Sequence, residues 1–403
     1  MNSVKFLILG AGPAGLSFAV RLMQNGERDF ALLESEHEAG GLCRSVDVDG
    51  SALDIGGGHI LDVRRPEVVK FLFGFMPRDE WNHFVRDTTI YISGKYISHP
   101  FEANIWQTGI DSQVEYLASI ARAGSVTGQP MPEKFTDWIA WKLGEKIARE
   151  YMIPYNTKMF GAELDKLGTY WLDKLPSVSF EDTLLSCLEH KAHAKQPGHA
   201  EFYYPVEYGY GEVWLRMAES LEGRIFYGQK VNAIDFDAHT VGTAEGDEYH
   251  GEIIINTIPY REFRELRGMP EKLRQSINEL KHTSVQVKYI PENMNTSAQW
   301  IYCPDLSLSY HRKFLRHNVL LGSKGYWLET NADRTEPDDG RFAYMNRYAY
   351  PLNTLNKPQI MKSLLEWLES RNVYGLGRWG EHQHYNSDLT VELGLKLADK
   401  FSR

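Results

Sequence analysis

Apolar residues near the amino end form two short runs, which a glycine-rich turn and a periodic segment separate. The run Val4–Leu9 is typical of a buried parallel strand, and the turn Gly10-Ala11-Gly12-Pro13-Ala14-Gly15 follows it directly. After the turn, Leu16–Met23 continues with apolar residues at helical spacing, and Phe30–Leu33 reads as a second buried strand. This order of elements predicts a βαβ unit that opens an α/β domain with a parallel sheet.

The glycines of the turn stand where a dinucleotide site needs them. Gly10 permits the tight turn, Gly12 lets backbone N–H groups approach a pyrophosphate at the helix N-terminus, and Gly15 lets the helix pack against the strand. Glu34 ends the second strand about 20 residues beyond the turn, where a carboxylate accepts hydrogen bonds from a ribose diol. The predicted cofactor-binding residues here are Gly10, Gly12, Pro13, Ala14, Gly15, Glu34 and Ser35.

Later segments predict a discontinuous Rossmann-type domain with two additions. Apolar periodicity predicts a mostly helical insertion over 86–195, which opens with a hairpin near 89–97. Extended runs flanked by helices near 271–280 and 359–368 predict a sheet-based substrate domain over 266–364. The segments 1–85, 196–265 and 365–403 then form the cofactor domain.

Composition narrows the possible functions. The 403 residues exceed what one core usually serves, and 42% hydrophobic residues are typical of a folded protein. The net charge of −10 without a basic block argues against a nucleic-acid or anionic-membrane partner. Cys43, Cys187 and Cys303 form no C-x-x-C motif, which favours a reducing cytoplasm over a disulfide framework. We expect no signal peptide, no membrane span and no metal site.

Two further glycine segments favour flavin over nicotinamide. Glu38–Ser45 resembles the G-G-x-x-R/S/T segment of the FAD-dependent amine oxidase and protoporphyrinogen oxidase superfamily, and the glycines of Asp54–Ile60 would let backbone lie against a flavin ring. Val373–Gly380 and Asp388–Gly394 resemble that superfamily's closing FAD segment, and Lys230–Ile234 resembles its adenine-contacting strand. The resemblance implies FAD contacts for Gly41, Leu42, Arg44, Gly57, Gly58, His59, Val231, Gly377, Arg378, Asp388 and Leu389.

An ordered set of segments resembles one group of that superfamily, the UDP-galactopyranose mutases. His99–Ile105 is similar to the Y-P-F-x-x-N-I segment of these enzymes, and Trp300–Pro304 with Arg312 is similar to their W-L-Y-F-P followed by arginine. The other matching segments are 135–139, 154–160, 204–214 and 347–351.

This resemblance implies a nonredox reaction with reduced FAD. In the mutases the flavin N5 attacks the sugar anomeric carbon and expels UDP, and the adduct opens and recloses as a furanose. The diphosphate needs a fixed cation, so we expect Arg312 to bind it with Tyr302 and Tyr350 as hydroxyl donors. His59 would lie beside the flavin, which completes the predicted catalytic set. The resemblance also implies substrate contacts for Phe101, Asn104 and Asn156.

Two departures put UDP-galactose itself in question. Where the mutases carry an arginine-containing stretch, this chain has Trp171–Ser177 with Lys174 as the cation, and lysine is a point charge rather than a bidentate fork. His384 stands where a substrate-contacting tyrosine is expected. Lys174 and His384 are therefore predicted substrate-binding residues for another nucleotide sugar. NAD(P)H is a candidate reductant that would enter the same cleft.

Two other functions stay open at this stage. An oxidoreductase of the amine oxidase type would take hydride from a non-nucleotide substrate, often with an aromatic cage and a lysine–water pair at the flavin. Trp327, Tyr344 and Tyr348 are candidates for such a cage. A flavin-binding scaffold without turnover is the third possibility. The sequence does not determine the oligomeric state.

Overall fold

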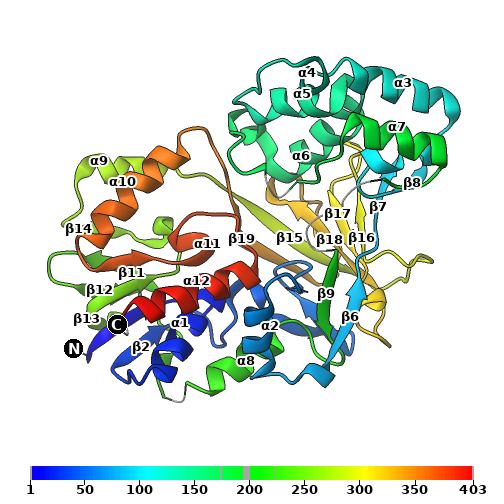
Figure 1. The fold of residues 1–403 in the computed structure, drawn as a ribbon. Helices are drawn as coiled ribbons and strands as arrows, with labels where there is room; N and C mark the ends of the chain where they lie inside the picture. The colour runs from blue at the N-terminus through cyan, green and yellow to red at the C-terminus, as the bar shows by residue number, and fades with distance from the viewer. Residues whose placement is uncertain (1, 173–174, 194–199, 222, 402–403) are drawn as a thin grey trace.

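Strand β1 (Asn2–Leu9) lies inside an eight-stranded sheet whose order is β10-β2-β1-β13-β12-β11-β14, with β20 beside β13. The computed structural model describes residues 2–172, 175–193, 200–221 and 223–401 (Figure 1). The other strands of this sheet are β2 (Phe30–Leu33), β10 (Ile225–Phe226), β11 (Val231–Asp235), β12 (Thr240–Thr243), β13 (Glu248–Asn256), β14 (Glu265–Arg267) and β20 (Val373–Gly375). β1 pairs in parallel with both β2 and β13, so the predicted βαβ unit and its α/β class are confirmed.

Alternation along β1 builds a hydrophobic core on each face of this sheet. Phe6 and Ile8 pack in one cluster with α1 (Pro13–Gln24), α8 (Glu212–Glu219) and α12 (Ser387–Lys400). Leu7 and Leu9 pack in the opposite cluster, which includes α9 (Glu271–Glu279) and α10 (Lys357–Glu369). Successive side chains of a strand point to opposite faces, so one apolar strand serves both cores. Both α9 and most of α10 fall within the predicted substrate segment 266–364. They nevertheless cover the eight-stranded sheet, which we call the cofactor sheet because it contains the predicted βαβ unit.

A second sheet has seven strands in the order β19-β15-β18-β17-β16-β7-β8. Its strands are β7 (Thr88–Ile92), β8 (Lys95–Ser98), β15 (His282–Ile290), β16 (Trp300–Tyr302), β17 (Arg312–Phe314), β18 (Tyr326–Asn331) and β19 (Ala343–Pro351). The hairpin β7–β8 joins this sheet because β7 pairs in parallel with β16. The hairpin thus belongs to the sheet and not to the helices that follow it. The domain boundaries as a whole remain a prediction.

Two small sheets connect the cofactor sheet to the second sheet. One contains β5 (Leu61–Asp62), β9 (Glu201–Pro205) and β6 (Trp81–Val85), and the other is the hairpin of β3 (Ser45–Val48) and β4 (Ser51–Asp54). A short helix, α2 (Pro66–Phe73), lies between β5 and β6. The chain passes from β6 directly into β7, so residues 86 and 87 join the small sheet to the large one.

A group of helices covers one end of the second sheet and is drawn in cyan and green at the top of Figure 1. They are α3 (Ile110–Ala121), α4 (Gly124–Thr127), α5 (Phe135–Ile147), α6 (Ile153–Phe160) and α7 (Phe180–Glu189). The pattern over 135–151 predicts one helix, but α5 gives way to a π-helical turn at Ala148–Met152. Gly144 has a φ of 77°, and a Cβ there would lie 2.7 Å from the Ser119 carbonyl oxygen of α3. Close packing of two helices therefore interrupts the predicted helix.

The carboxyl-terminal segment returns to the cofactor sheet. β20 pairs in parallel with β13, and α11 (Gly377–Gly380) leads to α12, which packs beside α1 (Figure 1). Within the described ranges, no helix is both long and apolar enough to cross a bilayer. All three cysteines are buried and carry free thiols.

Candidate functional site

A cavity of about 480 Å³ opens at the carboxyl ends of β1, β2 and β13, and we call it the first cavity. Parallel strands that share an edge bring their following loops together, which is where α/β sheets bind ligands. The predicted cofactor residues that line it are Gly10, Gly12, Pro13, Ala14, Glu34, Ser35, Gly41, Leu42, Arg44, His59, Val231 and Arg378. They come from sequence positions as far apart as 10 and 378.

The glycine turn has the geometry that a pyrophosphate requires. Gly10 has a φ of 102°, and a Cβ on Gly15 would lie 2.0 Å from the Gly10 carbonyl oxygen, so α1 rests directly on the turn. Gly12 is different, because its Cβ would meet only the Cα of Gly41, at 3.9 Å. The space in front of Gly12 thus belongs to the cavity and to the helix N-terminus, where N–H groups attract anions.

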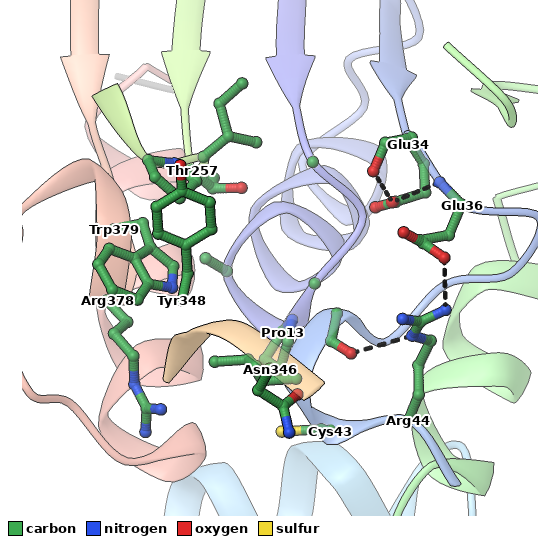
Figure 2. Close-up of a pocket in the computed structure, with 18 of the residues that line it drawn as sticks. Pro13, Glu34, Glu36, Cys43, Arg44, Thr257, Asn346, Tyr348, Arg378 and Trp379 are labelled. Carbon is green, nitrogen blue, oxygen red and sulfur yellow. Dashed lines mark hydrogen bonds and ion pairs between the residues drawn. The ribbon is translucent and has the colours of Figure 1, made fainter. Parts of the chain in front are cut away.

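Glu34 is held in place by backbone donors. It accepts hydrogen bonds from the Ala11 N–H at 2.8 Å and from the Glu36 N–H at 3.0 Å. Burial raises the pKa of Glu34, and these hydrogen bonds oppose that effect. The Ser35 hydroxyl also donates to Glu34, at 3.2 Å. A carboxylate has about four acceptor positions, so Glu34 keeps about one for a ribose hydroxyl. Figure 2 shows Glu34 on one side of the glycine turn, with Tyr348, Arg378 and Trp379 on the other.

Arg44 lies along the rim of the first cavity. It donates to Glu36 Oε2 at 3.1 Å (Figure 2). It also donates to the Gly41 carbonyl at 3.1 Å and to Tyr344 Oη at 2.9 Å. Its guanidinium is therefore fixed beside the glycine pair that faces Gly12. Together, the open space at Gly12, the acceptor at Glu34 and the cation at Arg44 fit a bound FAD.

A second cavity, of about 320 Å³, extends between the cofactor sheet, the seven-stranded sheet and the helices. His59, Arg378 and Ser387 line both cavities, so the two adjoin. The predicted residues that line the second cavity are Gly57, Gly58, His59, Asn156, Tyr302, Arg312, Tyr350, Arg378, His384 and Asp388. The structure thus brings together residues from five separate segments of the predicted site.

Arg312 is held by strand register. It lies opposite Glu329 in the β17–β18 pair, and its guanidinium donates to the Glu329 carboxylate and, at 3.2 Å, to Tyr350 Oη. Burial alone would lower the pKa of Arg312, but the charge of Glu329 raises it well above its ordinary value. Arg312 therefore stays a cation. Its Nε, which is buried, has no hydrogen-bond partner within the described part of the protein.

His59 is neutral at ordinary pH. Burial and the charge of Arg378 lower its pKa to about 3. Its Nδ1 lies 3.1 Å from the Gly57 carbonyl oxygen, which can only accept, so Nδ1 carries the proton. The Nε2 atom is then an acceptor at the junction of the two cavities.

Other residues of the cofactor prediction lie near the cavities or support them. Arg378 donates to the carbonyls of Tyr385 and Ala349, which ties the last loop to β19. Asp388 lies in the first turn of α12 and pairs with Arg65. Gly15, Gly377 and Leu389 line neither cavity, although a Cβ on Gly377 would lie 2.7 Å from Ala14 Cβ.

Two predicted substrate contacts need correction. Phe101 is 0% exposed and packs against Tyr116 and Tyr151, so it belongs to the core behind the cavity wall. Asn104 is buried and donates to the Pro100 carbonyl. The neighbouring Glu102 lines the second cavity in their place. Lys174, the third predicted contact of this kind, lies outside the described residues.

Several cavity residues escaped the sequence analysis. Arg86, His99, Tyr151 and Tyr155 line the second cavity, and the Tyr155 ring lies 5.1 Å from that of Tyr302. Arg86 had no motif to mark it, because its neighbour in space, Trp300, is more than 200 residues away. Tyr155 lies in the family-like segment 154–160, next to the predicted substrate contact Asn156, and this position could have indicated that Tyr155 belongs to the site.

Comparison with known proteins defines the class. Residues 13–290 match the family of flavin containing amine oxidoreductases, and this match spans more than half of the chain. The protein belongs to that family, which implies a flavin cofactor and an enzyme of a flavin oxidoreductase family.

The particular fold is that of UDP-galactopyranose mutase. A crystal structure of the reduced mutase is 22% identical, covers 99% of this chain and 95% of its own, and superposes with a TM-score of 0.88. A putative protoporphyrinogen oxidase from Exiguobacterium sp. 255-15 is 13% identical, covers 100% and 99%, and has a TM-score of 0.70. Putrescine oxidase bound to putrescine is 14% identical, covers 100% and 99%, and has a TM-score of 0.62.

One curated relative covers part of the chain. An uncharacterized protein in the nifH2 3′ region of Methanothermococcus thermolithotrophicus is 42% identical over 110 residues, which is 26% of this chain and 100% of that protein.

Proposed function

We propose that the protein is an FAD-dependent enzyme that contracts the pyranose ring of a nucleotide sugar without net redox change, as in the conversion of UDP-galactopyranose to UDP-galactofuranose. The observation that carries this proposal is the position of Arg312, Tyr302 and Tyr350 in the second cavity, which adjoins the first cavity. A fixed guanidinium flanked by hydroxyl donors suits a diphosphate that leaves and returns.

The ion pair with Glu329 fixes Arg312 before substrate arrives. Glu329 is 1% exposed and accepts from Arg312 on the opposite strand, so the guanidinium needs little reorganisation to meet a phosphate. Tyr350 accepts from Arg312, which leaves its own hydroxyl hydrogen for a phosphate oxygen. The negative charge that develops on the leaving diphosphate would be stabilised by these groups.

FAD, when bound in its reduced form, supplies the nucleophile for the anomeric carbon. His59 would contribute an acceptor, the unprotonated Nε2, at the junction where sugar and cofactor meet. The aromatic rings of Tyr155, Tyr302 and Tyr350 would limit water around the reacting sugar. FAD, the nucleotide sugar and these residue roles are parts of the proposal.

The charge of the second cavity favours this reaction over amine oxidation. Arg86, Arg312 and Arg378 line it, and so do three carboxylates, Asp62, Glu102 and Asp388. Asp62 pairs with Arg64 and Asp388 pairs with Arg65, while burial raises the pKa of Glu102. In the part of the chain that the structure describes, these carboxylates therefore do not pair with the arginines of the cavity, and an amine substrate would bring a further positive charge. No lysine lines the second cavity among the described residues, which speaks against a lysine–water pair there. Of the residues considered for an aromatic cage, Tyr344 and Tyr348 line the first cavity instead, and Trp327 is buried in the core.

An anaerobic turnover assay tests the proposal. The purified holoenzyme is reduced with dithionite and mixed with UDP-galactopyranose and then with other nucleotide sugars. Product ring size is measured by chromatography, and flavin absorbance is followed throughout. We expect a furanose product only from the reduced enzyme, with no net flavin oxidation. Failure with every nucleotide sugar, together with reduction of the oxidised holoenzyme's flavin by an amine, would establish the oxidase alternative instead.

A further inference from the structure

Arg86 lies where the chain crosses from β6 to β7, and contacts from several directions fix it. Its backbone N–H donates to the Ala200 carbonyl at 2.8 Å. Its Nε donates to Thr88 Oγ1 and its Nη2 to Tyr302 Oη, each at 2.9 Å. The guanidinium lies 4.6 Å from the centre of the Trp300 ring. A long side chain with this many contacts is ordered in one direction, toward the second cavity.

The charge of Arg86 lacks a counterion, unlike the charge of Arg312. Across the described residues, no carboxylate oxygen lies within 4.0 Å of the Arg86 side chain, whereas Arg312 pairs with Glu329. The two side-chain partners of Arg86 are neutral hydroxyls. A half-buried guanidinium with neutral partners gains free energy from an anion that enters the same cavity.

Tyr302 connects Arg86 to Arg312. It lies directly opposite Arg312 in the β16–β17 pair, and its hydroxyl accepts from Arg86. Strand pairing brings opposite side chains within about 5 Å at Cβ, so both guanidiniums border the same hydroxyl region of the cavity. A hydroxyl that accepts from Arg86 keeps its hydrogen for an incoming oxygen. The arrangement offers two cations and a hydroxyl donor to one ligand.

We infer that Arg86 is the second cation of the diphosphate site, so that Arg86 and Arg312 bind the diphosphate of a nucleoside diphosphate sugar with Tyr302 between them. This inference rests on the proposed function. Arg86 would then supply a bidentate guanidinium as the second cation for the diphosphate, the role for which the sequence predicts Lys174. Arg86 would also favour substrates that carry a diphosphate.

Equilibrium binding to the oxidised holoenzyme tests this assignment. UDP, UMP, uridine and inorganic pyrophosphate are titrated separately into the wild type, Arg86→Gln, Arg86→Lys and the control Arg122→Gln. Arg122 is an exposed arginine at the end of α3 and lines neither cavity, so its loss removes the same charge elsewhere. The visible spectrum of the bound flavin checks that each variant folds and retains its cofactor.

We expect Arg86→Gln to weaken UDP binding by about 10- to 100-fold, as for the loss of hydrogen bonds to a charged group, and to leave uridine binding unchanged. Arg86→Lys should fall between wild type and Arg86→Gln, and Arg122→Gln should match the wild type. A UDP affinity within about two-fold of wild type in Arg86→Gln would overturn the assignment. An equal loss for uridine and UDP would also overturn it, because it would indicate a structural role.

Pyrophosphate separates this inference from the proposed function. If the wild type binds none of the three uridine compounds, the proposed function fails in its nucleotide-sugar form. Pyrophosphate binding that Arg86→Gln abolishes would still establish the anion site, and pyrophosphate binding that the variant retains would reject it.

Discussion

Replacing Gly12 with alanine separates cofactor binding from stability. Gly12 has φ −79° and ψ −177°, which any residue adopts, and the nearest atom to a Cβ there is Gly41 Cα at 3.9 Å. The apoprotein therefore has room for the methyl group, and we expect its stability to change by no more than about 1 kcal/mol. The methyl group would instead occupy the space where a pyrophosphate must approach the backbone.

The expected effect on FAD follows from this overlap. Inserting a methyl group into a well-packed contact costs about 1–3 kcal/mol, which corresponds to about a 5- to 150-fold weaker FAD affinity. Gly15→Ala provides the contrast, because its Cβ would lie 2.0 Å from a backbone oxygen in the apoprotein itself. That variant should lower apoprotein stability as well as FAD affinity.

Two measurements on each apoprotein decide the matter: the FAD dissociation constant, from a fluorescence titration, and the thermal unfolding midpoint without cofactor. Wild-type FAD affinity in Gly12→Ala would refute the reasoning, because the cofactor would then not approach this turn. A large loss of apoprotein stability in Gly12→Ala would also refute the reasoning, because it would show that the apoprotein has no room for a methyl group beside Gly12.

Three further predictions concern buried groups. Burial raises the pKa of Glu381 to about 7, so its stabilising contribution is present below its ordinary pKa of 4.5 and is lost as pH rises through 7. The difference in free energy of unfolding between Glu381→Gln and wild type should therefore shift in favour of the variant by up to about 3 kcal/mol between pH 4 and pH 8. Equal thermal unfolding shifts at both pH values would contradict this. The pKa of His59 falls to about 3 on folding, so its contribution to stability is present above pH 6.5 and is lost as pH falls toward 3. In this range the free energy of unfolding of His59→Gln should fall by up to about 1.4 kcal/mol less per pH unit than that of the wild type. Parallel curves of stability against pH would exclude this. Phe101→Ala should cost about 3–5 kcal/mol of stability because the ring is fully buried. A changed KM with unchanged denaturant unfolding would instead indicate that Phe101 contacts the substrate.

The parts of the fold that local patterns predict are those with short-range causes. The first strand, the glycine turn, α1 and β2 follow one another within 33 residues, and turn chemistry with apolar periodicity is enough to predict them. The parallel pairing of β7 with β16 joins residues near 90 to residues near 301, and no local signal specifies it. The break in helix α5 at Gly144 likewise depends on a second helix, which the periodicity of 135–151 does not contain.

The candidate site divides in the same way. Arg312, Tyr302 and Tyr350 were predicted from family-like segments, and all three line the second cavity. Phe101 lies in an equally family-like segment but faces the core, because neighbouring residues in one short helical turn point in different directions. Glu329 contacts Arg312 on the neighbouring strand, and Arg86 contacts Tyr302 of another segment, so no local sequence signal marks either residue.

The first cavity takes its walls from both ends of the sequence, from Gly10 to Thr390. During synthesis, the turn at Gly10 leaves the ribosome well before the segment around Arg378, which lies several hundred residues later in the chain. At about 5–20 residues per second, the early βαβ unit exists for tens of seconds before the cavity can close around a cofactor. Flavin capture is therefore a late event in the life of each new chain, and the half-built sheet must remain folded or protected until β20 pairs with β13.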